Sequence, residues 1–141
     1  MAITLNRVFD FLDWKHLFIR FRPAYSTFEM TLFEKILPFL DKDRRNVFQS
    51  NLSEINSRTW GFEGSEAWYY KIRRFKPNSE REQYFKMNTK SERLFSGKII
   101  LKDGTKININ VHAFNRNFSH ITFSADPRKF RKTEQFILEK R

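Results

Sequence analysis

The chain of 141 residues has no cysteine, and it has only four glycines and four prolines. Without cysteine it can form neither a disulfide nor a thiolate nucleophile, and a zinc site would have to consist of histidine and carboxylate ligands. So few glycines leave little room for a glycine-rich loop that binds phosphate. The sequence also lacks the HExxH, P-loop, dinucleotide-binding and Gly-x-Ser-x-Gly motifs. We therefore expect a protein that is not an enzyme and that holds no cofactor and no metal.

Long apolar runs are missing as well. No stretch approaches the roughly 18 apolar residues of a membrane helix. Arg7, Asp10 and Asp13 interrupt the apolar residues near the N-terminus, where a signal peptide would be continuous. We expect a soluble cytoplasmic protein without a membrane span.

Phenylalanine and positive charge are abundant instead. Seventeen phenylalanines and a hydrophobic content of 40% can supply one aromatic core, so we expect a single domain over residues 1–141. The net charge of +11 comes entirely from the second half: residues 1–70 hold 9 basic and 9 acidic residues, whereas residues 71–141 hold 18 and 7. Such a field attracts an acidic partner, whether protein, nucleic acid or anionic lipid.

Two helices are expected in the first half of the chain. The sequence STFE, residues 26–29, is a capping box that begins a helix, and Pro38 would disturb or end it. A second helix would follow Asp41 or Asp43 as its N-cap and continue to Gly61.

Less regular patterns lie on either side of these helices. Residues 3–14 have the spacing of a short helix, and residues 17–21 alternate like a strand. The stretch 75–92 is polar and rich in breakers, which predicts a long loop.

The sequence EAWYYKIRR, residues 66–74, alternates as a half-buried strand does. We assign Tyr69, Lys71 and Arg73 to its polar side. If this strand joins the sheet formed by the later strands, these three side chains share a surface with them.

Two hairpins are expected after residue 92. A three-residue loop that ends at Gly104 would set Ile99 opposite Ile107 and Phe95 opposite Val111, so that the large apolar residues share one face.

A second three-residue loop, with Asn117 in the left-handed conformation, would set Ile109 opposite Phe123 and His112 opposite His120. The two histidines would then project from the polar side of the sheet, together with Lys98 and Asn110.

The end of the chain predicts one more helix. Asp126-Pro127 is an N-cap followed by a first-turn proline, and it would open a short basic C-terminal helix anchored by Phe130 and Ile137. The expected fold class is α+β, with N-terminal helices packed on one face of an antiparallel β-sheet meander.

Two facing histidines have more than one interpretation. They can belong to a solvated sheet face, contact a partner, or act as general acid and base in metal-independent phosphodiester cleavage. A bis-histidine metal site is disfavoured, because we expect no carboxylate on the same face.

Basic and aromatic residues alternate in YYKIRRFK, residues 69–76, and in RKFRK, residues 128–132. This composition is typical of nucleic-acid contacts, in which cations meet phosphates and rings stack on bases. A solvated basic face and a contact with an acidic protein have the same composition.

From about Thr27 to Phe130 the chain resembles a group of small bacterial α+β proteins of toxin–immunity systems. The residues that carry the resemblance are FEKILPFLDKDRRNVFQSNLSEI, WYYKIRR and NFSHITFSADPRKF. The chain departs from that group in its excess of positive charge and in Arg116, where a turn glycine is usual. The resemblance implies a non-enzymatic binder that neutralises a toxin by covering its surface.

We therefore expect an immunity-type binding protein that contacts an acidic toxin or effector through a basic surface. A nucleic-acid-binding protein and a histidine-dependent nuclease are the alternatives. The residues expected to contact the partner are Tyr69, Lys71, Arg73, Lys98, Asn110, His112, His120, Arg128, Lys129, Arg131 and Lys132.

Overall fold

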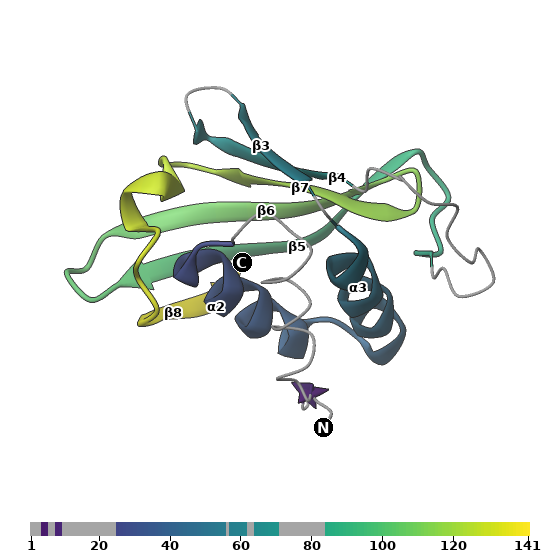
Figure 1. Cartoon of the computed structure of the whole chain (residues 1–141), viewed down its shortest axis with the longest axis horizontal. Coiled ribbons are helices and arrows are strands. Elements are labelled where there is room, and N and C mark those ends of the chain that lie inside the picture. Colours follow the sequence, from purple (N-terminus) through teal and green to yellow (C-terminus); the bar gives the residue numbers. More distant parts are fainter. Residues whose placement is uncertain (1–3, 6–7, 10–24, 56, 62–63, 71–83) are drawn as a thin grey trace.

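The structure, a computed structural model, describes residues 4–5, 8–9, 25–55, 57–61, 64–70 and 84–141. Two helices precede a six-stranded sheet in these residues (Figure 1). The helical elements are α2 (Thr27–Ile36), the 3-10 turn η1 (Leu37–Phe39), α3 (Lys42–Glu54) and the 3-10 turn η4 (Pro127–Phe130). The strands of the sheet are β3 (Ser57–Gly61), β4 (Glu66–Tyr70), β5 (Ser91–Leu101), β6 (Lys106–Phe114), β7 (Asn117–Phe123) and β8 (Phe136–Lys140).

The sheet has the strand order β3-β4-β7-β6-β5-β8, and all its pairings are antiparallel. Both helices lie on one side of it (Figure 1). The inward-facing side chains of the sheet and the apolar sides of the helices form one core, which includes Phe28, Phe33 and Phe48. The expected α+β fold, with helices before the strands, is confirmed.

The local signals that begin the two helices behave as predicted. The Ser26 hydroxyl accepts a hydrogen bond from the Glu29 amide at 3.1 Å, and the Glu29 carboxylate accepts one from the Ser26 amide at 2.9 Å. Asp41 is the N-cap of α3 and accepts from the Arg44 amide at 2.8 Å. The turn η1, which contains Pro38, separates the two helices.

Helix α3 ends earlier than the sequence predicts. It stops at Glu54, because Ile55 is already extended with φ −66° and ψ 131°. The next residues form β3, which pairs with β4 from Ser57 to Gly61. The prediction that the helix continues to Gly61 is wrong, because the residues SRTWG pair with β4 as a strand instead.

The β5–β6 hairpin has the predicted register. Gly104 has a φ of +90°, and Ile99 pairs with Ile107. Phe95 pairs with Val111, and a bulge lies just before Phe95, between it and Arg93.

The β6–β7 hairpin reaches the predicted register by another route. Asn115 and Arg116 have φ values of 50° and 68°, so they form a two-residue turn, and the predicted three-residue loop with a left-handed Asn117 is wrong. The register then shifts by one residue, which leaves Ser119 as an extra residue in β7. His112 therefore still pairs with His120.

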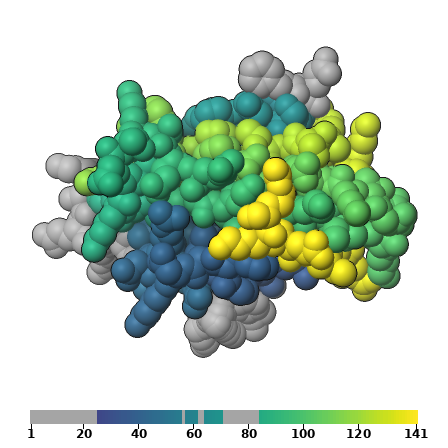
Figure 2. Space-filling view, turned by 180° about the vertical axis from the view of Figure 1, so that it is seen from behind, coloured from purple at the N-terminus to yellow at the C-terminus, as the bar shows by residue number. Residues whose placement is uncertain are grey.

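The predicted C-terminal helix is also wrong. Asp126 caps only the short turn η4, and the chain then forms β8, which pairs with β5. Figure 2 shows these C-terminal residues in yellow against the green strands, above the blue helices. The alternation of buried Phe136 and Leu138 with Ile137, which is 60% exposed rather than anchored, fits a strand and not a helix.

The other expectations fall mostly on residues that the structure does not describe. Within the predicted helix 3–14, Thr4–Leu5 and Val8–Phe9 form paired strands, β1 and β2, so a helix is wrong there. The predicted strand 17–21 lies outside the described residues. Residues 84–90 have neither helix nor strand, as predicted, and β5 begins at Ser91. In the part of the chain that is described, no helix is both long and apolar enough to cross a membrane.

Candidate binding surface on the open sheet face

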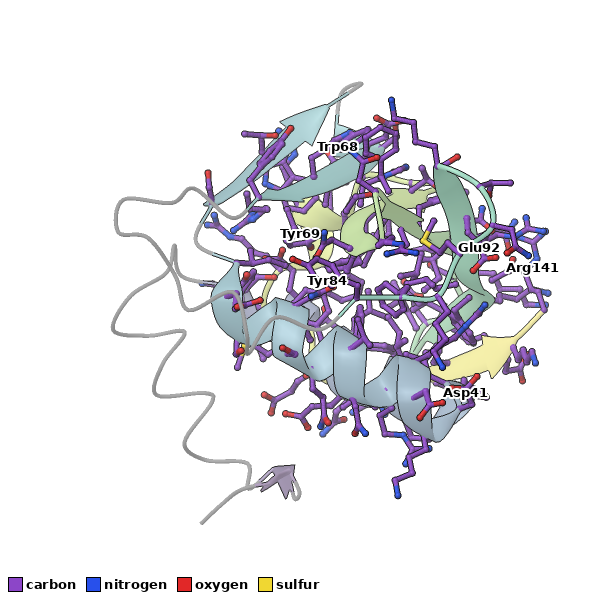
Figure 3. The ribbon with its side chains drawn as sticks, turned by 90° about the vertical axis from the view of Figure 1, so that its right-hand side faces the viewer. Asp41, Trp68, Tyr69, Tyr84, Glu92 and Arg141 are labelled. Carbon is purple, nitrogen blue, oxygen red and sulfur yellow. The ribbon has the colours of Figure 1, made fainter. Side chains whose placement is uncertain are left out.

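The side of the sheet opposite the helices is covered by no element among the described residues; we call it the open face (Figure 1). Because successive side chains in a strand point to opposite sides, the register assigns every side chain to a face. In Figure 3, Trp68 lies on the open side of β4 and Tyr69 lies between the sheet and the helices. The open face includes the polar and aromatic residues Glu66, Trp68, Tyr70, Arg93, Ser96, Lys98, Lys106, Asn108, Asn110, His112, His120, Thr122 and Glu139. The apolar residues Ile100, Phe114 and Ile137 lie on the same face.

A line of directly opposed residues crosses four strands of this face. Trp68 of β4 faces His120 of β7, which faces His112 of β6, which faces Arg93 of β5. We call these four residues the cross-strand row. The Trp68 and His120 rings are stacked with centroids 4.0 Å apart and planes at 15°, and the two histidine rings are stacked at 4.4 Å and 10°.

This stacking determines which part of each ring is available to a ligand. The ring planes are nearly parallel and follow one another across the strands, so each ring stands upright on the sheet. The inner faces of the stack are occupied by the neighbouring rings. The ring edges, with their nitrogen atoms, are therefore the parts that can meet a partner.

Hydrogen bonds hold the row in place. The indole Nε1 of Trp68 donates to Oε1 of Glu66 at 2.8 Å. The Ser119 hydroxyl lies 2.7 Å from Nδ1 of His120 and donates to the His112 carbonyl at 3.3 Å.

Both imidazoles are neutral near pH 7. Burial lowers the pKa of His112, and Arg93 lowers it further, whereas Glu66 opposes the shift. Burial, followed by repulsion from His112, lowers the pKa of His120 to about 4, again against the effect of Glu66. The row is therefore uncharged except for its Arg93 end.

Two cations of the open face form no ion pair within the described residues, although Glu139 of β8 lies directly opposite Lys98. Within the described residues, neither Arg93 nor Lys98 forms a hydrogen bond or an ion pair through its side chain. Next to them, the Ser96 hydroxyl donates to Oδ1 of Asn110 at 2.8 Å, which leaves the Asn110 amide nitrogen for a ligand. Glu66 and Glu139 lie on the same face, so its charge is mixed rather than uniformly positive.

The predicted site residues do not all meet. Lys98, Asn110, His112 and His120 share the open face as predicted. Tyr69 does not, because β4 has the opposite orientation: Tyr69 is 4% exposed and its hydroxyl donates to Oε2 of the buried Glu29 at 2.8 Å. Its assignment to the contact surface is wrong, and Lys71 and Arg73 lie outside the described residues.

The basic C-terminal residues form a separate surface. Arg128, Lys129, Arg131 and Lys132 are exposed, but they lie between β7 and β8. The Arg131 carbonyl accepts from the Phe28 amide at 3.1 Å, which places this segment beside the start of α2, on the helix side. Arg128 is paired with Asp126 at 2.8 Å.

Sequence reasoning missed four residues that contribute to the row: Glu66, Trp68, Arg93 and Ser119. Glu66 and Trp68 would have been predicted if the residues of β4 that face away from the core had been assigned correctly. Arg93 and Ser119 reach their positions through β-bulges, which no pattern in the sequence indicates.

The row does not form a metal centre. Glu66 does lie on the same face as the histidines, contrary to the expectation that no carboxylate would. Yet no group of three or more potential metal ligands occurs among the described residues. The parallel histidine rings also direct their nitrogen lone pairs side by side rather than toward one point.

Comparison with known proteins does not assign the chain. No family model, no curated protein and no solved structure matches it. Its function therefore has to be inferred from its own residues.

Proposed function

We propose that this chain is a non-enzymatic, cytoplasmic binding protein of immunity type, which neutralises an acidic toxin or effector by direct contact. The open face is the contact surface, and the observation that carries the proposal is a pair of cations without an ion pair, Arg93 opposite His112 and Lys98 further along β5. Cations without an ion pair on an uncovered sheet face are suited to pairing with carboxylates of another protein.

Mixed charge on the open face is compatible with a protein partner. Glu66 and Glu139 would contribute specificity. They would repel a wrong partner that places acidic groups opposite them. The overall charge of +11 would speed the encounter with an acidic partner from a distance.

The experiment is a binding measurement with the product of the adjacent gene, using mass photometry at about micromolar concentration. We expect a complex with the parent chain. Lys98→Glu should weaken it by at least tenfold, because a cation of the open face becomes an anion. Lys42→Glu makes the same change on α3, on the other side of the sheet, and should leave the affinity unchanged. Failure of the parent chain to form any complex would contradict the proposal.

Nucleic acid is the second candidate partner, and the exposed segment 128–132 is the observation that favours it, because it presents four cations in five residues. Three of these cations, Lys129, Arg131 and Lys132, have no ion pair within the described residues. Mixed oligonucleotides at about 50 mM salt, where phosphate contacts are strongest, test this function in a gel-shift assay. Binding that is lost in a variant with all three residues changed to glutamine would support nucleic acid.

The histidine-dependent nuclease ranks below both. A general acid and a general base must reach opposite sides of the scissile phosphate. The rings of His112 and His120 are in contact at 4.4 Å, which leaves no room for a phosphate between them. Cleavage of RNA by the parent chain, lost in His120→Ala, would overturn this ranking.

A further inference from the structure

We infer that the Arg93 end of the cross-strand row is a receptor for one carboxylate group of the partner, bound by the Arg93 guanidinium together with the ring edge of His112. This inference rests on the proposed function, since it identifies what the open face recognises.

Arg93 is positioned for this role. It lies directly opposite His112 across the strands β5 and β6, and its side chain is exposed. Its neighbour Glu92 is paired with Arg44 at 2.9 Å, so that carboxylate is already engaged. An exposed guanidinium that forms no ion pair can bind a carboxylate through two parallel hydrogen bonds.

His112 would complete the receptor by taking up a proton. The groups that face the histidine pair are Glu66 from β4, Arg93 from β5 and the other imidazole. A carboxylate bound beside His112 would offset the repulsion from Arg93 and favour the charged imidazolium. Binding should therefore tighten as the pH falls from 7.5 to 5.5, by up to tenfold per pH unit if one full proton is taken up.

A carboxylate fits this surface better than the phosphates of a nucleic acid. Nucleic-acid binders without sequence preference combine a continuous positive groove with ring faces on which bases stack. Here Glu66 and Glu139 interrupt the positive charge, and the inner ring faces are occupied by Trp68, His120 and His112 themselves.

The test is a titration of the full chain with a hexaglutamate peptide, followed by NMR of the histidine ring protons and the backbone amides. We expect weak binding, at about millimolar concentration, because few ion pairs form. Saturating peptide should raise the pKa of His112 by at least half a unit. A 12-nucleotide oligouridylate is the second probe, and it should move neither the histidine signals nor the amides of the open face.

Two variants that each remove one positive charge from the open face provide the control. Arg93→Gln should weaken peptide binding by about tenfold and abolish the shift in the pKa of His112, as expected for the loss of a charge-assisted hydrogen bond. Lys106→Gln removes a charge at the far end of β6 and should change the affinity by less than about twofold. Circular dichroism verifies that both variants are folded.

The outcomes separate this inference from the proposed function. If the peptide moves the Lys98 and Asn110 amides while the pKa of His112 stays constant, the open face binds acidic protein and the receptor is wrong. If the peptide binds nowhere on the open face, both are wrong. If the oligouridylate moves the histidine signals and the peptide does not, the ligand is a phosphate and the carboxylate receptor is overturned.

Discussion

Single residues show the contrast between the two sides of the sheet. Phe123 is 6% exposed, and its ring lies 6.3 Å from that of Phe28 in the core. His112 lies on the opposite, open face, where its ring stacks on that of His120. The alternation of side chains along each strand therefore separates residues that stabilise the fold from residues that are available for binding.

Truncation of these two side chains should have very different costs. Phe123→Ala should lower the free energy of unfolding by about 3–5 kcal/mol, because it empties part of a close-packed core. His112→Ala should cost about 1 kcal/mol or less, since it removes one stacked pair on a half-exposed surface. Denaturant unfolding measures both. A greater loss in His112→Ala than in Phe123→Ala would mean that the strand register is shifted by one residue.

The buried hydroxyl of Tyr69 should contribute to stability through Glu29. Tyr69→Phe removes the donor to Oε2 of Glu29 and leaves a buried carboxylate oxygen without it, at a cost of about 1–3 kcal/mol. Tyr70→Phe is the matched control, because Tyr70 is the next residue, is 43% exposed and faces the open side. It should change the free energy of unfolding by less than about 0.5 kcal/mol. Equal losses in the two variants would contradict the orientation of β4.

The histidine pair should make stability depend on pH. The folded-state pKa of His120 is about 4, below the unfolded value, so the unfolded state binds more protons between about pH 4 and 6.5. Protonation then favours unfolding, and stability falls as the pH is lowered through this window. Since the ring is half-exposed, the loss should be only about 1 kcal/mol.

His120→Gln isolates this contribution. The variant should lose less stability between pH 6.5 and pH 4.5 than the parent chain does, as measured by urea unfolding at each pH. Identical pH profiles would show that His120 titrates normally in the folded state.

Among the elements, the β6–β7 turn has an unfavourable sequence. Arg116 has a φ of 68°, a left-handed conformation that costs a residue with a side chain about 1–2 kcal/mol. A two-residue turn of this kind favours Asn-Gly, and Asn115 is already present. Arg116→Gly should therefore raise the free energy of unfolding by about 1 kcal/mol.

Arg116→Ala is the control for this prediction. Alanine also removes the arginine side chain, but it keeps the strain of a positive φ, so the stability should not rise. Thermal unfolding of the two variants decides the matter, and an equal gain in both would point to the charge of Arg116 rather than to its backbone.

Elements with strong local signals were predictable, and those that depend on distant pairing were not. The capping box of α2 and the N-cap of α3 involve residues three positions apart, so the sequence contains all their partners. The strands β3 and β8 form because β4 and β5 offer them a free edge, which no local pattern indicates. For the candidate site, the position of both histidines on the polar side followed from alternation, whereas their direct opposition and the position of Arg93 depend on bulges.

At the scale of the whole molecule, charge should govern the rate of association. With a net charge of +11, the chain should bind an acidic partner with an association rate that falls steeply as salt increases from 50 to 500 mM. The dissociation rate should change much less. Stopped-flow measurements with the partner protein separate the two rates, and a salt-independent association rate would contradict electrostatic steering.

The strand order β3-β4-β7-β6-β5-β8 also has a consequence for the order of folding. Strands β5, β6 and β7 are consecutive and joined by tight turns, so they can pair early at little entropic cost. Strand β4 pairs with β7, with Trp68 opposite His120. This pairing closes the long connection between β4 and β5, so it has a larger entropic cost. The row of rings would thus be the last part of the open face to assemble, and its β4 end should be the first to open in native-state hydrogen exchange.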